Sequence, residues 1–167
     1  MNAYQIKELK NFMAKLLVTD TFDDFLLEEA TITTYNTFVI DGRMVKEFFS
    51  GDTNGDALPE SEFSAWKDMK GLCFDLIKGK RTPVNFKIIL HLKPVLMEEI
   101  LQKGNSALSL SDVKAFVLNL KYDGSKLTCI TGTAFYNFVL DKTPDKLWDE
   151  YISRFLTEKG ISFEENS

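Results

Sequence analysis

A polar loop in the first half of the chain has the residue types of a calcium site. Asp52, Asn54 and Asp56 place carboxylate and amide oxygens at alternate positions, and Glu62 follows near the point where an EF-hand loop ends. An EF-hand also needs glycine at its sixth position and a bidentate glutamate at its twelfth. Counted from Asp52, those positions hold alanine and phenylalanine. An exposed loop that leads into a helix therefore explains this segment better than a cation site does.

A basic segment, KGKRTPVNFK, contains the residues that could contact an anion. These residues are Lys78, Lys80, Arg81 and Lys87. Cations at the end of a helix also interact favourably with its partial negative charge, and this interpretation is favoured. No aromatic residues alternate with the cations closely enough to suggest binding of a single nucleic-acid strand. Anion contact by these four residues is kept as the alternative.

The sequence assigns no catalytic residue and no cofactor. His91 is the single histidine, and its place on the polar side of an alternating strand predicts a surface position. No G-x-S-x-G turn accompanies it, and neither phosphate-binding glycine motif occurs. The acidic run between Asp20 and Glu29 is typical of a solvated loop and strand edge rather than of paired catalytic carboxylates. We therefore lean towards a protein that is not an enzyme.

Composition limits the partners and the compartment. The chain has 167 residues, of which 44% are hydrophobic and 27% charged, with a net charge of −5. This charge disfavours nucleic acid as a partner, and no apolar run is long enough to span a membrane. Cys73 and Cys129 lie far apart and predict reduced core thiols. Since MNAYQIKELKNFMAKLL has no signal-peptide pattern, we expect a cytoplasmic protein. The partner we expect is another protein or a second copy of the chain.

Periodicity predicts the elements of the first half. Residues 6–17 form an amphipathic helix, and Ala3 to Ile6 can precede it as a short strand. Residues 25–41 read as two strands joined near Thr34 to Asn36, and residues 46–49 read as a short third strand. A second helix is expected to begin near Pro59 and to end before Gly79.

The second half predicts a similar order of elements. A strand at residues 86–92 is followed by a helix that Pro94 opens, and then by a hairpin with its turn at Asp123-Gly124. AFYNFVLD is expected to add a third antiparallel strand. Thr143 is expected to cap a last helix, and residues 161–167 to form a flexible tail.

An internal similarity connects the two halves. TITTYNTFVID at residues 31–41 resembles TGTAFYNFVLD at residues 131–141. The sequence thus predicts one α+β domain over residues 1–167, with antiparallel sheets, packed helices and two pseudo-repeats at 1–82 and 83–160. Each repeat would have the order β-α-β-β-β followed by a helix with a tryptophan.

Two resemblances follow from these segments. FKIILHLKPVLMEEILQKG, followed by VKAFVLNLKYDGSKLTCITGTAFYNFVLD, resembles half of a DNA sliding-clamp domain, which implies two helices packed on a curved antiparallel sheet. Nearly the whole chain, including KNFMAKLLVTDTFDDFLLEEATITTYNTFVIDGR, DLIKGKRTPVNFKI and KYDGSKLTCITGT, is similar to a bacterial family of unknown function, and this resemblance implies no activity. A DNA-encircling clamp would need basic helices, whereas the helix after Pro94 carries Glu98 and Glu99.

Two functions stay open from the sequence. The first is a non-catalytic binding or scaffold protein that engages protein. The second is a small-molecule-binding protein or enzyme with an aromatic-lined cavity between the sheet and the helices. The 14 phenylalanines are compatible with such a cavity and equally with a filled core.

Overall fold

The computed structural model describes residues 1–50, 59 and 61–166. The described strands are β1 (Ala3–Ile6), β2 (Phe25–Thr33), β3 (Thr37–Asp41), β4 (Ser64–Ala65), β5 (Asn85–Leu92), β6 (Val113–Tyr122), β7 (Leu127–Phe135) and β8 (Phe163–Asn166). The described α-helices are α1 (Leu9–Leu17), α2 (Trp66–Ile77), α3 (Pro94–Lys103) and α4 (Thr143–Glu158). A 3₁₀ helix, η1, spans Lys46–Phe49.

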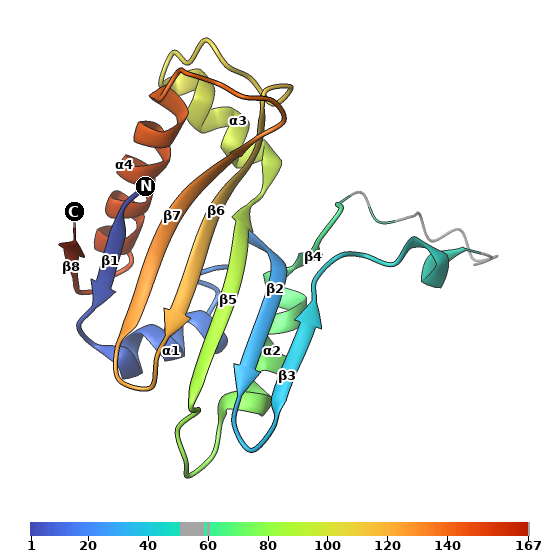
Figure 1. Cartoon of the computed structure of the whole chain (residues 1–167), viewed down its shortest axis with the longest axis vertical. Coiled ribbons are helices and arrows are strands. Elements are labelled where there is room, and N and C mark those ends of the chain that lie inside the picture. The colour runs from blue at the N-terminus through green and yellow to red at the C-terminus, as the bar shows by residue number, and fades with distance from the viewer. Residues whose placement is uncertain (51–58, 60, 167) are drawn as a thin grey trace.

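All of these strands belong to one antiparallel sheet, which confirms the α+β class (Figure 1). The strand order is β3-β2-β5-β6-β7-β1-β8, and the short β4 also pairs with β2. β3 and β8 are therefore the two edges. The chain termini lie close together because β1 and β8 pair along their whole length.

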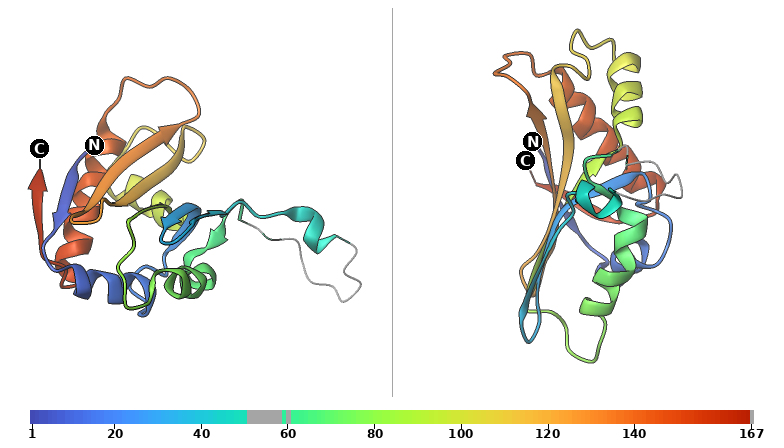
Figure 2. Two further views of the ribbon diagram at one scale, coloured as in Figure 1. Left: turned by 60° about the horizontal axis from the view of Figure 1, so that its bottom comes forward. Right: turned by 90° about the vertical axis from the view of Figure 1, so that its right-hand side faces the viewer.

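The four helices cover one face of the sheet and leave the other face without a helix (Figure 2). Alternation along the strands explains this arrangement, because successive side chains of a strand point to opposite faces. In β5, for example, Phe86, Ile88 and Leu90 are buried under the helices, whereas Lys87 points to the other face. None of the helices described in residues 1–50 and 61–166 is both long and apolar enough to cross a lipid bilayer.

Buried tryptophans fix two of the helices. Trp66 and Trp148 have no exposed surface, as expected from their place on the apolar faces of α2 and α4. The indole nitrogen of Trp66 donates a hydrogen bond to the carbonyl of Leu16 at 2.9 Å, and that of Trp148 donates to the carbonyl of Val117 at 2.8 Å. Each large apolar side chain is thus buried with its one polar atom satisfied.

The first half differs from the sequence prediction in two places. Lys46–Phe49 is a 3₁₀ helix and not a strand, and no residue of it is buried. The second helix begins at Trp66, seven residues after Pro59, because Ser64 and Ala65 first extend along β2 as β4. Backbone pairing with β2 therefore overrides the helix-start signal that proline gives.

The second half differs in three places. AFYNFVLD does not form a strand of its own: β7 runs on through Gly132 to Phe135, and residues 136–141 are irregular. Thr143 does not cap α4 with its side chain; the carboxylate of Asp141 accepts the N–H of Thr143 instead, at 2.9 Å. The expected flexible tail is ordered as far as residue 166, because β8 pairs with β1 and Ile161 is buried.

The two halves share an element order but not a sheet environment. Apart from η1 and β4, the order β1-α1-β2-β3-α2 is followed by β5-α3-β6-β7-α4. In the sheet, however, β5 pairs with the first strand of the other half's hairpin, β2, whereas β1 pairs with the second strand of the other half's hairpin, β7. Phe38 to Asp41 lie in an edge strand, and Phe138 to Asp141 lie in an irregular segment. These placements do not confirm the predicted duplication or a clamp-like arrangement.

Two glycines give a stability test with opposite signs. A Cβ atom on Gly42 would lie 1.9 Å from the carbonyl oxygen of Leu27, whereas a Cβ on Gly71, inside α2, would have no neighbour within 4 Å. We expect Gly42→Ala to lower the free energy of unfolding by at least about 2 kcal/mol, because the backbone of β2 must move. Gly71→Ala should raise it by up to about 1 kcal/mol, because alanine is the better helix former. Urea unfolding measures both changes, and equal effects of the two substitutions would contradict the described path of the chain at Gly42.

Candidate functional site

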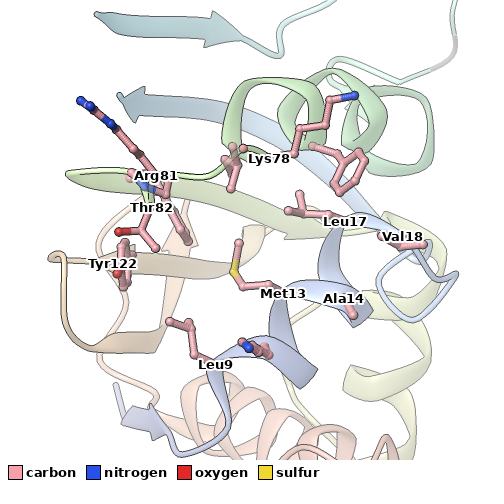
Figure 3. A pocket seen from close by; sticks show the side chains of 15 residues that line it. Leu9, Met13, Ala14, Leu17, Val18, Lys78, Arg81, Thr82 and Tyr122 are labelled. Carbon is pink, nitrogen blue, oxygen red and sulfur yellow. The ribbon is translucent and has the colours of Figure 1, made fainter. Parts of the chain in front are cut away.

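An apolar groove lies between α1 and α2, at the end of the sheet where β5 begins and β6 ends (Figure 3). Its volume is about 380 Å³, within the range of small-ligand pockets. Figure 3 shows the Met13 side chain reaching from α1 towards the middle of the hollow. The apolar lining residues are Leu9, Met13, Ala14, Leu17, Val18, Phe74, Ile77, Pro83 and Phe86. Tyr122 completes the lining from β6.

Two stacked aromatic rings contribute to the groove from the sheet. Phe86 and Tyr122 are neighbours across β5 and β6, and their ring centroids lie 5.2 Å apart at an interplanar angle of 28°. The Tyr122 hydroxyl donates a hydrogen bond to the carbonyl of Gly124 at 2.9 Å. This hydrogen bond fixes the orientation of the Tyr122 ring. The groove is therefore lined by aromatic rings of fixed orientation.

Hydrogen bonds at one end of α2 hold the two walls together. Besides the bond from Trp66 to Leu16, the Lys70 ammonium donates to the carbonyl of Thr19 at 2.8 Å and to the Asp23 carboxylate at 2.9 Å. These three contacts come from the first turns of α2, and the groove is lined by Phe74 and Ile77 from its last turns. The hydrogen bonds that hold the two walls together therefore lie at the other end of α2 and do not fill the groove.

The charged residues that line the groove are all cations: Lys10, Lys78 and Arg81. Lys78 is partly neutralised, because its ammonium lies 3.1 Å from the Asp75 carboxylate and 5.5 Å from the Phe74 ring. Lys10 and Arg81 form no ion pair with any residue in the described ranges. The groove thus combines an apolar interior with an excess of positive charge at its border.

The structure separates the four residues predicted to contact an anion. Lys78 and Arg81 line the groove, and Lys80 lines a neighbouring hollow beside Tyr35. Lys87 lies on the opposite face of the sheet, directly across from Lys121 of β6. The four residues are close in the sequence, but Arg81 precedes β5 and Lys87 lies within it. Because Phe86 faces the helices, its neighbour Lys87 faces the opposite side of the sheet.

Sequence periodicity missed most of the groove. The sequence predicted α1 as an amphipathic helix without separating core residues from groove residues: Phe12 and Leu16 are fully buried, whereas Met13 lines the groove. Phe74 of α2 is 37% exposed and lines the groove. A large aromatic residue off the core face of an amphipathic helix is the one signal that could have indicated this site.

The calcium-like loop falls largely outside the described residues. Asp52, Asn54 and Asp56 lie outside the described residues, so the prediction that they bind calcium stays untested. Glu62 is described, and its carboxylate lies 3.9 Å from the Arg43 guanidinium. Within residues 1–50, 59 and 61–166, no three histidine, cysteine, aspartate or glutamate side chains gather closely enough to hold a metal ion.

The two cysteines are free and buried, as predicted for core thiols. Burial raises the pKa of Cys73 to about 12 and also raises that of Cys129. Both side chains are therefore thiols at neutral pH, whereas a cysteine nucleophile reacts as the thiolate.

His91 is buried, so the prediction of a surface position is wrong. Phe63, just before β4, packs over it, and the Phe63 ring meets the imidazole edge-on with ring centroids 4.9 Å apart. Its Nε2 atom lies 3.2 Å from a Glu28 carboxylate oxygen, with an approach direction poor for a hydrogen bond. Burial lowers the pKa of His91, and Lys114 adds to this shift, while Glu28 and Glu62 oppose it. His91 is neutral at pH 7 and packs as part of the fold.

The lowered pKa of His91 predicts a pH-dependent stability. Below about pH 6.5 the unfolded chain binds a proton at this histidine more readily than the folded protein does, so the free energy of unfolding falls as the pH decreases. Above the unfolded pKa the histidine has no effect. We expect the wild type to lose more stability between pH 7.5 and 5.5 than His91→Gln does, by at most about 1.4 kcal/mol per pH unit. Urea unfolding at the two pH values measures this difference, and equal losses would show that His91 is not shifted.

Comparison with known proteins places the chain in a family without assigning an activity. No curated protein and no solved structure matches it. The family model described as "Family of unknown function (DUF5721)" matches residues 15–164. This range includes α2 but only the last three residues of α1, and all but the first and last strands of the sheet are complete within it. The chain therefore belongs to DUF5721, a family of unknown function.

Proposed function

We propose that this chain is a non-catalytic binding protein whose groove between α1 and α2 takes a small amphipathic anion. The observation that supports this function is the composition of the groove, which has an apolar interior and only cations among its charged lining residues. Burying an apolar group contributes about 25 cal/mol per Å² of area removed from water. The body of the ligand would supply this area, and its anionic end would lie near Arg81 and Lys10.

Binding accounts for the groove better than catalysis does. The described lining residues include no histidine, cysteine, aspartate or glutamate, which are the usual general acids, bases and nucleophiles. The pKa values of His91 and Cys73 are shifted, but neither residue lines the groove, and His91 points to the other face of the sheet. Shape, apolar area and charge are what the groove offers to a ligand.

Two related dyes test the apolar and the anionic parts separately. 1-Anilinonaphthalene-8-sulfonate carries a sulfonate, and N-phenyl-1-naphthylamine has the same rings without it. We expect both dyes to bind with increased fluorescence. Arg81→Met should weaken the sulfonate dye about two- to fivefold, as an exposed ion pair contributes up to about 1 kcal/mol, and should leave the neutral dye unchanged. Decanoate should displace the bound dye at lower concentration than decanol does.

A blocking variant shows whether the dyes bind in this groove. Ala14 is exposed on α1 and lines the groove, so Ala14→Trp should fill it and abolish binding of both dyes with little change in the free energy of unfolding. Lys67→Trp is the matched control, because Lys67 is exposed on α2 away from the groove. Equal binding by the Ala14→Trp and Lys67→Trp variants would exclude the groove as the site. A larger effect of Arg81→Met on the neutral dye than on the sulfonate dye would exclude an anionic ligand. Displacement of the dye by decanol at lower concentration than by decanoate would exclude it as well.

A further inference from the structure

In the described part of the chain, the edge strand β3 lacks the features that usually protect a sheet edge. It pairs only with β2 among the described strands, in an uninterrupted register from Asp41 opposite Glu29 to Thr37 opposite Thr33 (Figure 1). Natural edges are commonly protected by lysine, proline, a bulge or a covering segment, because unpaired N–H and C=O groups attract another strand. β3 contains neither lysine nor proline, and Val39 is 63% exposed. Tyr35 in the preceding turn is 86% exposed.

Two hydrogen bonds show which backbone groups of β3 are free. Gly42 donates its N–H to the carbonyl of Glu28 at 2.8 Å, so the even-numbered residues of β3 face β2. The carbonyl of Thr33 accepts from Val84 at 2.9 Å and therefore faces β5. Since the backbone groups of a strand alternate between its two neighbours, Thr37, Val39 and Asp41 point their N–H and C=O groups away from the sheet.

The opposite edge of the sheet is of a different kind. β8 contains Glu164 and Glu165 among its four residues, and the Glu164 side chain is 62% exposed. Pairing of two such strands would place carboxylates near one another, which is destabilising. Of the two edges, β3 is the one whose charge permits a second copy to approach.

We propose that two copies of this chain associate by antiparallel pairing of their β3 strands about a two-fold axis at Val39. In this register Val39 exchanges hydrogen bonds with its own counterpart, and Thr37 of each copy pairs with Asp41 of the other. All three outward residues are used. Phe38 of each copy lies next to Ile40 of the other on the face that the helices cover, where both side chains are only partly buried in one chain.

Charge and chain direction select this register over its neighbours. A two-fold axis at Asp41 would place that carboxylate opposite itself, and an axis at Thr37 would place Val39 opposite Tyr35 of the turn. An axis at Phe38 would place Asp41 opposite Tyr35 of the turn, and an axis at Ile40 would place Thr37 opposite Arg43 beyond the strand, so neither pairs all three outward residues of β3 with one another. A self-complementary edge of this kind gives a closed dimer, in which each copy contributes the same surface.

Sedimentation velocity tests the association. Because five residues a side bury less area than a standard interface, we expect a dissociation constant of roughly 10 µM and a dimer that forms between about 1 and 300 µM. Val39→Pro should give a monomer, since it removes an N–H that points away from β2 and leaves the β2 hydrogen bonds intact. Val39→Thr is the matched control and should still dimerise. A wild-type protein that stays monomeric at about 300 µM would overturn the proposal.

Disulfide formation tests the register without relying on the proline variant. In a hydrogen-bonded antiparallel pair the Cα atoms are about 5.5 Å apart, within disulfide reach. Under mild oxidation Val39→Cys should therefore form a covalent dimer. Thr37→Cys should not, because the two Thr37 positions would lie about 13 Å apart along the strands. The native thiols of Cys73 and Cys129 are buried and do not compete. Equal crosslinking of the two variants would overturn the register.

Discussion

One buried hydrogen bond, from the Trp66 indole nitrogen to the Leu16 carbonyl, sets the relation between α1 and α2. The carbonyls of the last turn of a helix have no partner within that helix, and burial without a partner is costly. Trp66 supplies the partner and fills the space between the two helices with an indole that has no exposed surface. Because α1 can approach α2 no closer than this side chain allows, the far ends of the helices are held apart over Phe86 and Tyr122, and the groove occupies that space.

The arrangement of helices on one face of the sheet determines where binding can occur. The covered face carries the large apolar side chains, and the apolar groove lies at the end of this face that α1 and α2 bound. On the other face, Phe63 packs on the sheet and covers His91. Most other positions of that face are polar or charged, such as Thr31 and Lys87, and some are half-buried aliphatic residues such as Ile89 and Val117. A single-layer covering therefore leaves two kinds of free surface, an apolar hollow and an unpaired strand edge.

Much of the fold could be predicted because local pattern and tertiary structure agree. The alternation in β5, the Asp123-Gly124 turn and the apolar faces of α2 and α4 each have one consistent interpretation, and the structure confirms them. The errors occur where pairing between distant segments decides the structure. β8 is acidic and polar and becomes ordered because β1 offers it a free edge. His91 is buried by Phe63, which lies 28 residues away in the chain. The groove could not be predicted because its lining comes from α1, α2, β5 and β6, and single-element periodicity cannot distinguish a residue that faces a core from one that faces a hollow.

The groove and the β3 edge are independent in their physical requirements. Every residue that lines the groove comes from one chain and none from β3, so a monomer has the whole site. The edge, in contrast, needs a second copy and uses backbone groups that no residue of the groove contacts. The segment from Lys78 to Thr82 brings them near one another, because its other side forms a hollow with Tyr35 in the β2–β3 turn. A ligand that contacts Arg81 can therefore affect association through this segment. If it does, linkage requires that association change the affinity for the ligand by the same factor.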